Sequence, residues 1–415
     1  MRGSQRLVSV LTVLTICSLP AYAQSSQKLR DRDPDLEASK KLAAELQQAN
    51  FHYGPFYLLS KLRLSDAGFS ETATLPTGYQ SGGLSLSLEA PQRLYFVPSK
   101  KTILTFEATP GYSFFQGNEN GKDGQFDYLL RGDAHFLFNH LYLDVYGLRE
   151  NQLAAHVADV NRLVTQKSDE TGVLGEVKYS SKTSALFNLR YRDTEFPEDR
   201  FQPEDKLVNI LDREERNGRI SLMHKTFPLT SLFVAAERSD YSFQRASYKD
   251  ATRTWYGGGA IYNAGRLQMR IEAGPARLDF DDPREHDFSG ILGSFTATRV
   301  NGRRTYTFGA DRDVGFSIFA LNNYFISNAL RVGVSHVATR KLTLRAGSTY
   351  ERDDYDVPFQ GNDRRDTISF TSLGFIYTIR RVSLGSDIGW YERSTTFGGD
   401  EDSGIRYVLH LSFTP

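Results

Sequence analysis

The chain has 415 residues, with 50 Lys and Arg balanced by 50 Asp and Glu. This balance provides no overall field that would hold a polyanion, so nucleic-acid binding would require a local basic patch, and the sequence has none. A mean hydropathy of -0.44 excludes a bundle of membrane helices, which need repeated apolar runs of roughly 20 residues, but it permits a membrane β-barrel, in which only alternate strand residues face lipid.

Residues 1–23 are expected to be a secretory signal peptide. Arg2 and Arg6 precede the apolar run 7–19, and Ala21-Tyr22-Ala23 fits a small-x-small cleavage site. The run is shorter than the roughly 18 apolar residues of a spanning helix, which argues against a membrane anchor. The single cysteine lies within this run, so the exported chain is expected to contain no disulfide.

Residues 24–54 are predicted to form a periplasmic N-terminal segment. Asp35 can cap a short helix in which Leu36, Leu42 and Leu46 fall on one side. The segment is interpreted as a lead-in or a small plug, with a disordered tail as the alternative, because so few large apolar residues bury little surface.

From residue 55 onward, apolar and polar residues alternate as they do in β-strands. In the clearest stretch, Leu267, Met269 and Ile271 alternate with Arg266, Gln268 and Arg270, which gives one apolar and one charged face. The final stretch, 405–413, alternates in the same way. In 367–377 the apolar residues change parity partway along, so the phase of this strand is ambiguous, and a β-bulge there would shift its register.

The connection lengths favour a membrane barrel over a soluble sandwich. Short links are predicted at 139–140, 180–182, 226–228, 263–265, 301–302, 339–340 and 379–380, and longer polar links at 116–124, 152–169, 194–213, 242–250, 280–286, 313–322, 354–364 and 395–402. An alternation of this kind is typical of outer-membrane barrels with tight periplasmic turns and longer external loops. We therefore predict an all-β fold, a transmembrane antiparallel up-and-down β-barrel over 55–415 with about 18 strands, or 16 as the alternative.

The chain is rich in aromatic residues, with 22 Tyr and 28 Phe. Those near predicted strand ends are expected to form girdles at the two bilayer interfaces, with ordinary core packing as the alternative. The residues concerned are Tyr95, Phe96, Tyr241, Trp255, Tyr324, Phe325, Tyr350 and Trp390.

No catalytic motif is evident. The histidines are scattered over unrelated segments, and no Gly-x-Ser-x-Gly elbow occurs. We therefore expect a protein that is not an enzyme and uses neither a cofactor nor a metal.

About eighteen strands enclose a barrel wide enough for an aqueous channel unless something plugs it. Its polar face carries charges of both signs, which differs from the single-sign filter of a phosphate-selective pore. A mixed surface with interleaved tyrosines suits a hydroxyl-rich, weakly charged solute, and the alternative is that these residues form structural salt bridges. The pore-lining candidates are Glu107, Arg131, Asp133, Arg190, Arg192, Arg266, Arg270, Glu272, Arg345 and Asp387.

The C-terminal half, roughly 240–415, resembles the β-barrel porin 2 group found with exopolysaccharide secretion genes. The likeness lies in Tyr256-Gly-Gly-Gly259, Asp279-Phe-Asp281-Asp282, Arg340-Lys-Leu342 leading to Tyr350-Glu-Arg-Asp353, Arg364-Arg-Asp366, and Arg380-Arg-Val-Ser-Leu384 leading to Tyr391-Glu-Arg-Ser394. The resemblance implies an outer-membrane channel through which a polysaccharide leaves the periplasm, working with an inner-membrane polymerase or export complex. A general diffusion porin and a surface structural or adhesive barrel remain alternatives.

The last strand looks like the terminal strand that the barrel assembly machinery of the outer membrane recognises. Its final aromatic residue, Phe413, is followed by Thr414 and Pro415, whereas the terminal aromatic is usually the last residue. Outer-membrane lipid and the assembly machinery are therefore the expected partners, and no nucleic acid is expected.

Overall fold

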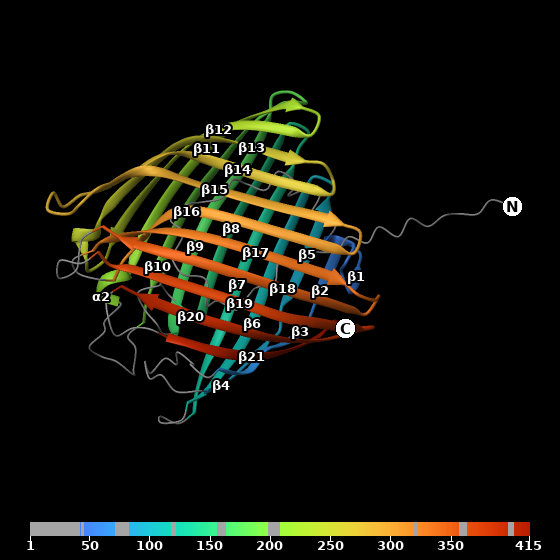
Figure 1. Ribbon diagram of the computed structural model, residues 1–415. Coiled ribbons are helices and arrows are strands. Elements are labelled where there is room, and N and C mark those ends of the chain that lie inside the picture. Colours follow the sequence, from blue (N-terminus) through green and yellow to red (C-terminus); the bar gives the residue numbers. More distant parts are fainter. Residues whose placement is uncertain are drawn as a thin grey trace.

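The computed structural model describes residues 42, 45–70, 83–117, 122–155, 163–197, 208–318, 322–356, 363–396 and 402–415. Within them the chain forms one antiparallel sheet that curls into a closed barrel (Figure 1). No helix in these ranges is long and apolar enough to span a membrane, an observation that does not bear on β-barrels. The predicted signal peptide, and most of the helix predicted after Asp35, lie outside the described residues.

The first part of the barrel contains the strands β1 (Phe51–Tyr53), β2 (Phe56–Ser60), β3 (Leu62–Ser70), β4 (Gly83–Glu89), β5 (Gln92–Ser99), β6 (Thr102–Gly117), β7 (Lys122–Leu137), β8 (Leu141–Ala155), β9 (Leu163–Lys178) and β10 (Thr183–Glu195). A short helix, α2 (Val208–Leu211), and a 3-10 turn, η2 (Ser247–Lys249), lie in later connections. The remaining strands are β11 (Arg213–Phe227), β12 (Thr230–Phe243), β13 (Ala251–Asn263), β14 (Leu267–Phe280), β15 (Phe288–Asn301), β16 (Arg304–Phe316), β17 (Tyr324–Val337), β18 (Leu342–Tyr355), β19 (Arg365–Ile379), β20 (Val382–Thr395) and β21 (Asp402–Phe413).

The barrel has eighteen strand positions, which confirms the predicted architecture. From β6 to β21 each strand pairs with the next, and β21 closes the barrel on β3. The position between β3 and β6 is filled by two consecutive strands, because β4 and β5 both pair with β6 and are separated only at Ala90-Pro91. Proline has no N–H to donate to the ladder, so an interruption at this point costs little.

The two ends of the barrel differ as predicted. β1, the C-terminus and the short turns lie at the right-hand end in Figure 1, whereas α2 and the strand ends that the longer connections join lie at the opposite end. The tightest turns suit their residues: Asn301 pairs with Arg304, and Gly302 between them has a φ of 59°, a left-handed conformation that glycine adopts without steric cost. The asymmetry places the short turns in the periplasm.

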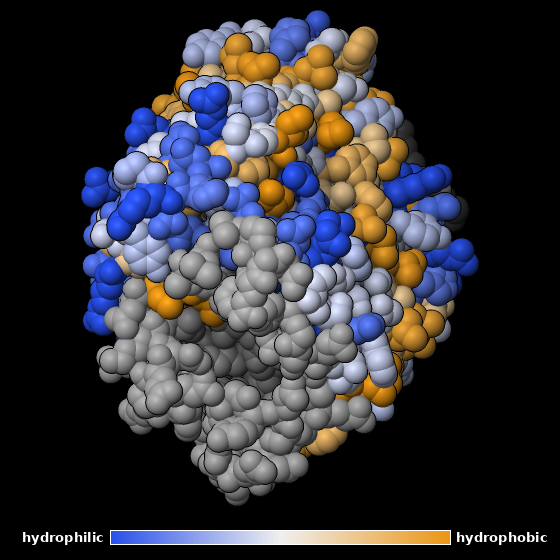
Figure 2. Space-filling view, turned by 60° about the vertical axis from the view of Figure 1, so that its left-hand side comes forward, coloured by the Kyte–Doolittle hydropathy of each residue, from blue (hydrophilic) through white to orange (hydrophobic). Residues whose placement is uncertain are grey.

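Each strand presents one apolar face outward. Ile220, Val234 and Ile291 are exposed by 60%, 62% and 66%, values that soluble proteins seldom show for such side chains but that lipid contact explains. Figure 2 shows hydrophobic residues running along the outer wall on the right-hand side of the view. The outward face is thus the lipid face of a membrane barrel.

The ambiguous phase of β19 is not caused by a bulge. The pairing of β19 with β18 and with β20 continues in unbroken register. Ile368 and Phe370 are buried inside the barrel, whereas Leu373 and Phe375 are exposed on its outer face. The apolar residues change parity because Ile368 and Phe370 occupy inward positions, between the buried Asp366 and Ser372, while the later apolar residues face outward.

The described part of the N-terminal segment packs inside the periplasmic mouth. Leu42 is buried against Tyr95 and Ile103, which share the inward parity of β5 and β6. Glu45 accepts a hydrogen bond from the Tyr95 hydroxyl at 2.8 Å, and Asn50 Nδ2 donates to the Pro415 carbonyl oxygen at 2.9 Å. These contacts attach the segment to the wall and to the C-terminal end of the barrel.

Candidate functional site: the inner wall of the barrel

The inner face is identified by contacts that reach across several strands. Tyr241 of β12 and Phe316 of β16 have ring centroids 5.0 Å apart, although three strands lie between them in the sheet. Side chains this far apart in the sheet can meet only on its concave side. On β12, the side chains that share the parity of Tyr241, among them Glu237, therefore point into the barrel.

A buried charge network occupies the inner face from β11 to β16. Arg219 contacts Glu237 at 2.9 Å and Glu272 at 3.0 Å, while Arg253 contacts Glu237 at 2.5 Å and Asp313 at 3.7 Å. The side chains of all five are at most 8% exposed. The network holds two cations and three anions, and Glu237 is shared by both arginines. We call these five residues the Arg219–Asp313 network.

Glycines in β13 and β14 make room for this network. A Cβ at Gly257 would lie 2.3 Å from the Trp255 ring, and one at Gly274 would lie 2.0 Å from the Tyr256 carbonyl oxygen. The Trp255 ring is fully buried, with the Arg219 guanidinium 4.9 Å above its centroid. The glycine run quoted for the family resemblance therefore has a packing role, because it lets β13 and β14 approach closely beneath a bulky ring.

A second charge network links β8, β9, β10 and β11. Glu170 receives Arg192 at 2.5 Å and the Tyr146 hydroxyl at 2.8 Å, and it lies 3.9 Å from Arg190. Arg190 also reaches Glu215 at 3.6 Å. Glu215 is held in turn by the buried Arg213 of its own strand at 2.8 Å.

Other ion pairs continue around the wall. Arg345 of β18 reaches Asp387 of β20 across the intervening strand, because Gly374 of β19 is in register with both and has no side chain to separate them. His410 of β21 also contacts Asp387, at 2.8 Å. Closer to the N-terminus, Glu107 pairs with Arg93 at 2.6 Å.

The loop-end half of the interior contains aromatic residues, which corrects part of the predicted interfacial girdle. Only Tyr350 and Trp390 are strongly exposed on the outer face, at 47% and 49%. Those buried instead are Tyr241, Trp255, Tyr324 and Phe325 in the loop-end half and Tyr95 at the periplasmic mouth, while Phe96 is half-buried. The strongly curved wall from β12 to β17 brings inward side chains into contact, so an apolar core forms where the sequence suggested that none was available.

Nine of the ten predicted pore-lining residues take part in ion pairs. The pairs not yet described are Arg131 with Asp133 at 2.7 Å and Arg270 with Glu272 at 3.1 Å. The exception is Arg266, which is exposed in the turn before β14. The network partners Glu215, Glu237, Arg253 and Asp313 were not among the candidates. Alternation places them on the polar face, but only the pairing of the strands shows which charges meet.

One group of side chains on this wall could hold a metal. Asp133, His135 and Asp144 each offer a ligand atom, and these atoms lie within 4.8 Å of one another. The sequence suggested no metal site, because the group is assembled from two strands.

Comparisons with known proteins agree with this architecture. Residues 151–407 match the family described as "Putative beta-barrel porin 2". No curated protein matches the chain. Among solved structures, OpdK of Pseudomonas aeruginosa with vanillate is 10% identical, with a TM-score of 0.51, covering 86% of this chain and 99% of its own.

Two further structures are similar at lower scores. A BenF-like porin of Pseudomonas fluorescens Pf-5 is 10% identical, with a TM-score of 0.49 over 86% of this chain and 99% of its own. A bacterial polysaccharide outer membrane secretin is 9% identical, with a TM-score of 0.37 over 86% of this chain and 98% of its own. The family match covers more than half of the sequence and agrees with the closed eighteen-strand barrel. The chain therefore belongs to the "Putative beta-barrel porin 2" family and is a β-barrel porin of the bacterial outer membrane.

Proposed function

We propose that this porin conducts a nascent exopolysaccharide from the periplasm to the cell surface. The observation that carries the proposal is the pairing of charges on the inner wall. Nine of the ten candidate residues, and both networks, pair cations with anions at no more than 3.9 Å. An inner wall whose charges are paired exerts little net electrostatic attraction on an ion. Its tyrosine hydroxyls and paired side chains offer hydrogen bonds to a hydroxyl-rich chain.

The ends of the barrel fit this direction of transport. The short-turn end carries the Leu42–Asn50 segment, and Asn50 is bound to the C-terminal residue. An inner-membrane polymerase or export complex would deliver the polymer at this periplasmic end. Delivery of the barrel itself to the membrane would depend on the assembly machinery, which would recognise β21.

Glycan-dependent current block tests the proposal directly. The purified barrel is inserted into planar bilayers, and a neutral oligosaccharide or a sulfated one of equal length is added to one side. We expect ionic conductance with reversible block by the neutral glycan at lower concentration than by the sulfated one. A channel blocked equally by both, or by neither, would contradict a polysaccharide path.

Gene deletion separates export from general diffusion in cells. Loss of secreted polysaccharide with unchanged uptake of small solutes is the expected result. The reverse pattern would indicate a diffusion porin, and no change in either would indicate a structural or adhesive barrel.

A matched pair of arginine variants tests whether the inner wall contacts permeating ions. Arg270 lies beside Glu272, so Arg270→Gln removes a positive charge from the wall and should shift selectivity towards cations. Arg266→Gln, four residues away in an exposed turn, is the control and should change selectivity less. Equal shifts would mean that the inner wall does not set the selectivity.

A further inference from the structure

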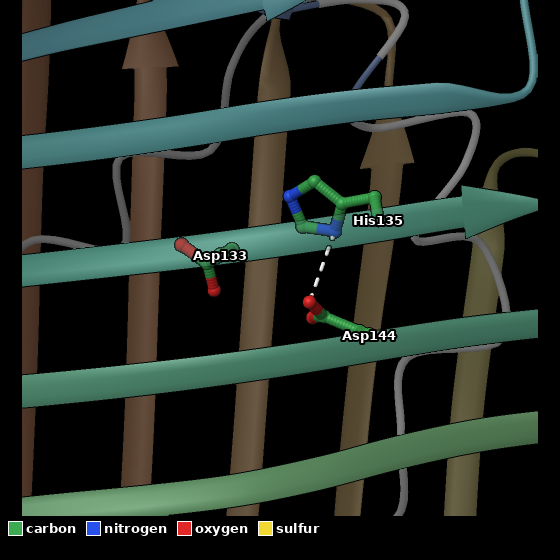
Figure 3. A group of neighbouring side chains, drawn as sticks. All are labelled: Asp133, His135 and Asp144. Atoms are coloured by element: carbon green, nitrogen blue, oxygen red, sulfur yellow. Dashed lines mark ion pairs between the residues drawn. The ribbon is translucent and has the colours of Figure 1, made fainter.

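A compact polar group on the inner wall takes no part in the two charge networks. Asp133 and His135 lie two residues apart on β7, and Asp144 lies directly opposite His135 in the register of β8. Figure 3 shows the side chains of His135 and Asp144 facing each other, with Asp133 beside them on the same strand as His135. Strand pairing thus fixes three potential metal ligands on one patch of wall.

The histidine is oriented as a metal ligand would be. Its Nδ1 lies 3.1 Å from Asp144 Oδ1 and 3.4 Å from the Tyr142 hydroxyl, and its Nε2 lies 3.2 Å from the Thr105 hydroxyl of β6. One ring nitrogen therefore faces the Asp144 carboxylate, while the other has an oxygen partner on the neighbouring strand. Histidines that bind metals usually make this second hydrogen bond, which fixes the ring and its tautomer.

The buried carboxylate of Asp144 is incompletely satisfied. Asp144 is 4% exposed, and within the described part of the chain its Oδ1 makes no hydrogen bond. Its ion-pair partner is His135 Nδ1, which carries charge only when protonated. A buried carboxylate oxygen without a hydrogen bond carries a desolvation penalty that a bound cation would remove.

Asp133 keeps a second oxygen for a ligand. Arg131 approaches Oδ1 of Asp133 with both Nε, at 2.8 Å, and Nη2, at 2.7 Å. These contacts occupy one carboxylate oxygen and orient the side chain, and they leave Oδ2 as the oxygen available to a cation. Arg131 thus holds the Asp133 carboxylate in place by hydrogen bonds, as neighbouring residues commonly do for carboxylates that bind metals.

We propose that Asp133, His135 and Asp144 form a binding site for one divalent transition-metal ion, such as Zn²⁺, on the inner wall of the barrel. One imidazole and two carboxylates are a donor set that suits these ions, and they leave a coordination position for water or a solute oxygen. The ion would tie β7 to β8 and add positive charge to this part of the wall.

Zinc titration of the full-length barrel in detergent tests the site. After treatment with a chelator, wild-type protein should bind one Zn²⁺ per chain, and Co²⁺ should give the visible absorption of a low-symmetry site. His135→Asn should lose this binding. Thr105→Val should weaken it by about 10- to 100-fold, because the hydroxyl acts only through the imidazole.

His410→Asn is the matched control, because His410 also lies on the inner wall beside an aspartate but, among the residues that the structure describes, belongs to no group of three potential metal ligands. It should bind zinc as wild type does. Heat-modifiability on gels shows that each variant is a folded barrel. Absence of zinc binding by the wild-type barrel, or full binding by folded His135→Asn, would overturn the site. Neither outcome bears on glycan conduction, which the bilayer experiment measures without zinc.

Discussion

Replacement of Glu237 by glutamine tests whether the Arg219–Asp313 network stabilises the barrel. Glu237 binds Arg219 at 2.9 Å and Arg253 at 2.5 Å, and all three side chains are 1% exposed. Glutamine has nearly the same volume, so it opens no cavity, but it removes the anion from between two buried cations. Arg219 keeps Glu272, and Arg253 keeps Asp313 at a longer 3.7 Å.

The expected loss of unfolding free energy follows from the burial of the two ion pairs that Glu237 makes. Breaking a buried ion pair by removing one partner costs about 3–5 kcal/mol, and the remaining acids place this variant near the lower value. The matched control is Glu214→Gln on β11, whose partner Arg216 is 3.6 Å away and 73% exposed. An exposed pair contributes about 1 kcal/mol or less.

Denaturant titration in lipid vesicles measures both losses. The chain has two tryptophans, so a Trp390→Phe background leaves Trp255, beneath Arg219, as the fluorescent reporter. Equal losses for Glu237→Gln and Glu214→Gln, or a loss below about 1 kcal/mol at Glu237, would show that the network does not stabilise the barrel.

Three further predictions address the glycines, the N-terminal segment and a loop carboxyl. Gly274→Val should destabilise the barrel by about 1–3 kcal/mol or more, because the valine side chain would collide with the Tyr256 carbonyl oxygen. Gly132→Ala, which has open space around the added methyl group, should leave stability unchanged, and the same denaturant titration compares the two variants. Leu42→Asp should release the N-terminal segment from the wall and raise single-channel conductance, and unchanged conductance would mean that this contact does not restrict the channel. Burial raises the pKa of Asp212, between α2 and β11, to about 6, so its contribution to loop stability is present in full below about pH 4 and is lost as the pH rises through 6. Hydrogen-exchange protection factors around Asp212, which divide out the pH dependence of the intrinsic exchange rate, should therefore be lower at pH 8 than at pH 5, and Asp212→Asn should abolish that difference in protection.

The sequence by itself determined the class of fold. A period of two depends only on which face of a strand meets lipid, so the alternation around Ile271 and in 405–413 could be read without any partner strand. Loop lengths are likewise a property of the linear chain. Together they predicted the eighteen-strand barrel, its two unlike ends and the inward direction of residues such as Asp387 and Glu272.

Only the tertiary structure decided which inward residues meet. Contacts such as Arg345 with Asp387, or Arg253 with Asp313, depend on strand register and on the curvature of the wall, and neither is encoded in local periodicity. The same curvature gathers Trp255 and its aromatic neighbours into an interior core, where strand-end position alone predicted an interfacial girdle. A sequence pattern specifies the face on which a side chain lies, whereas closure of the barrel specifies its neighbours.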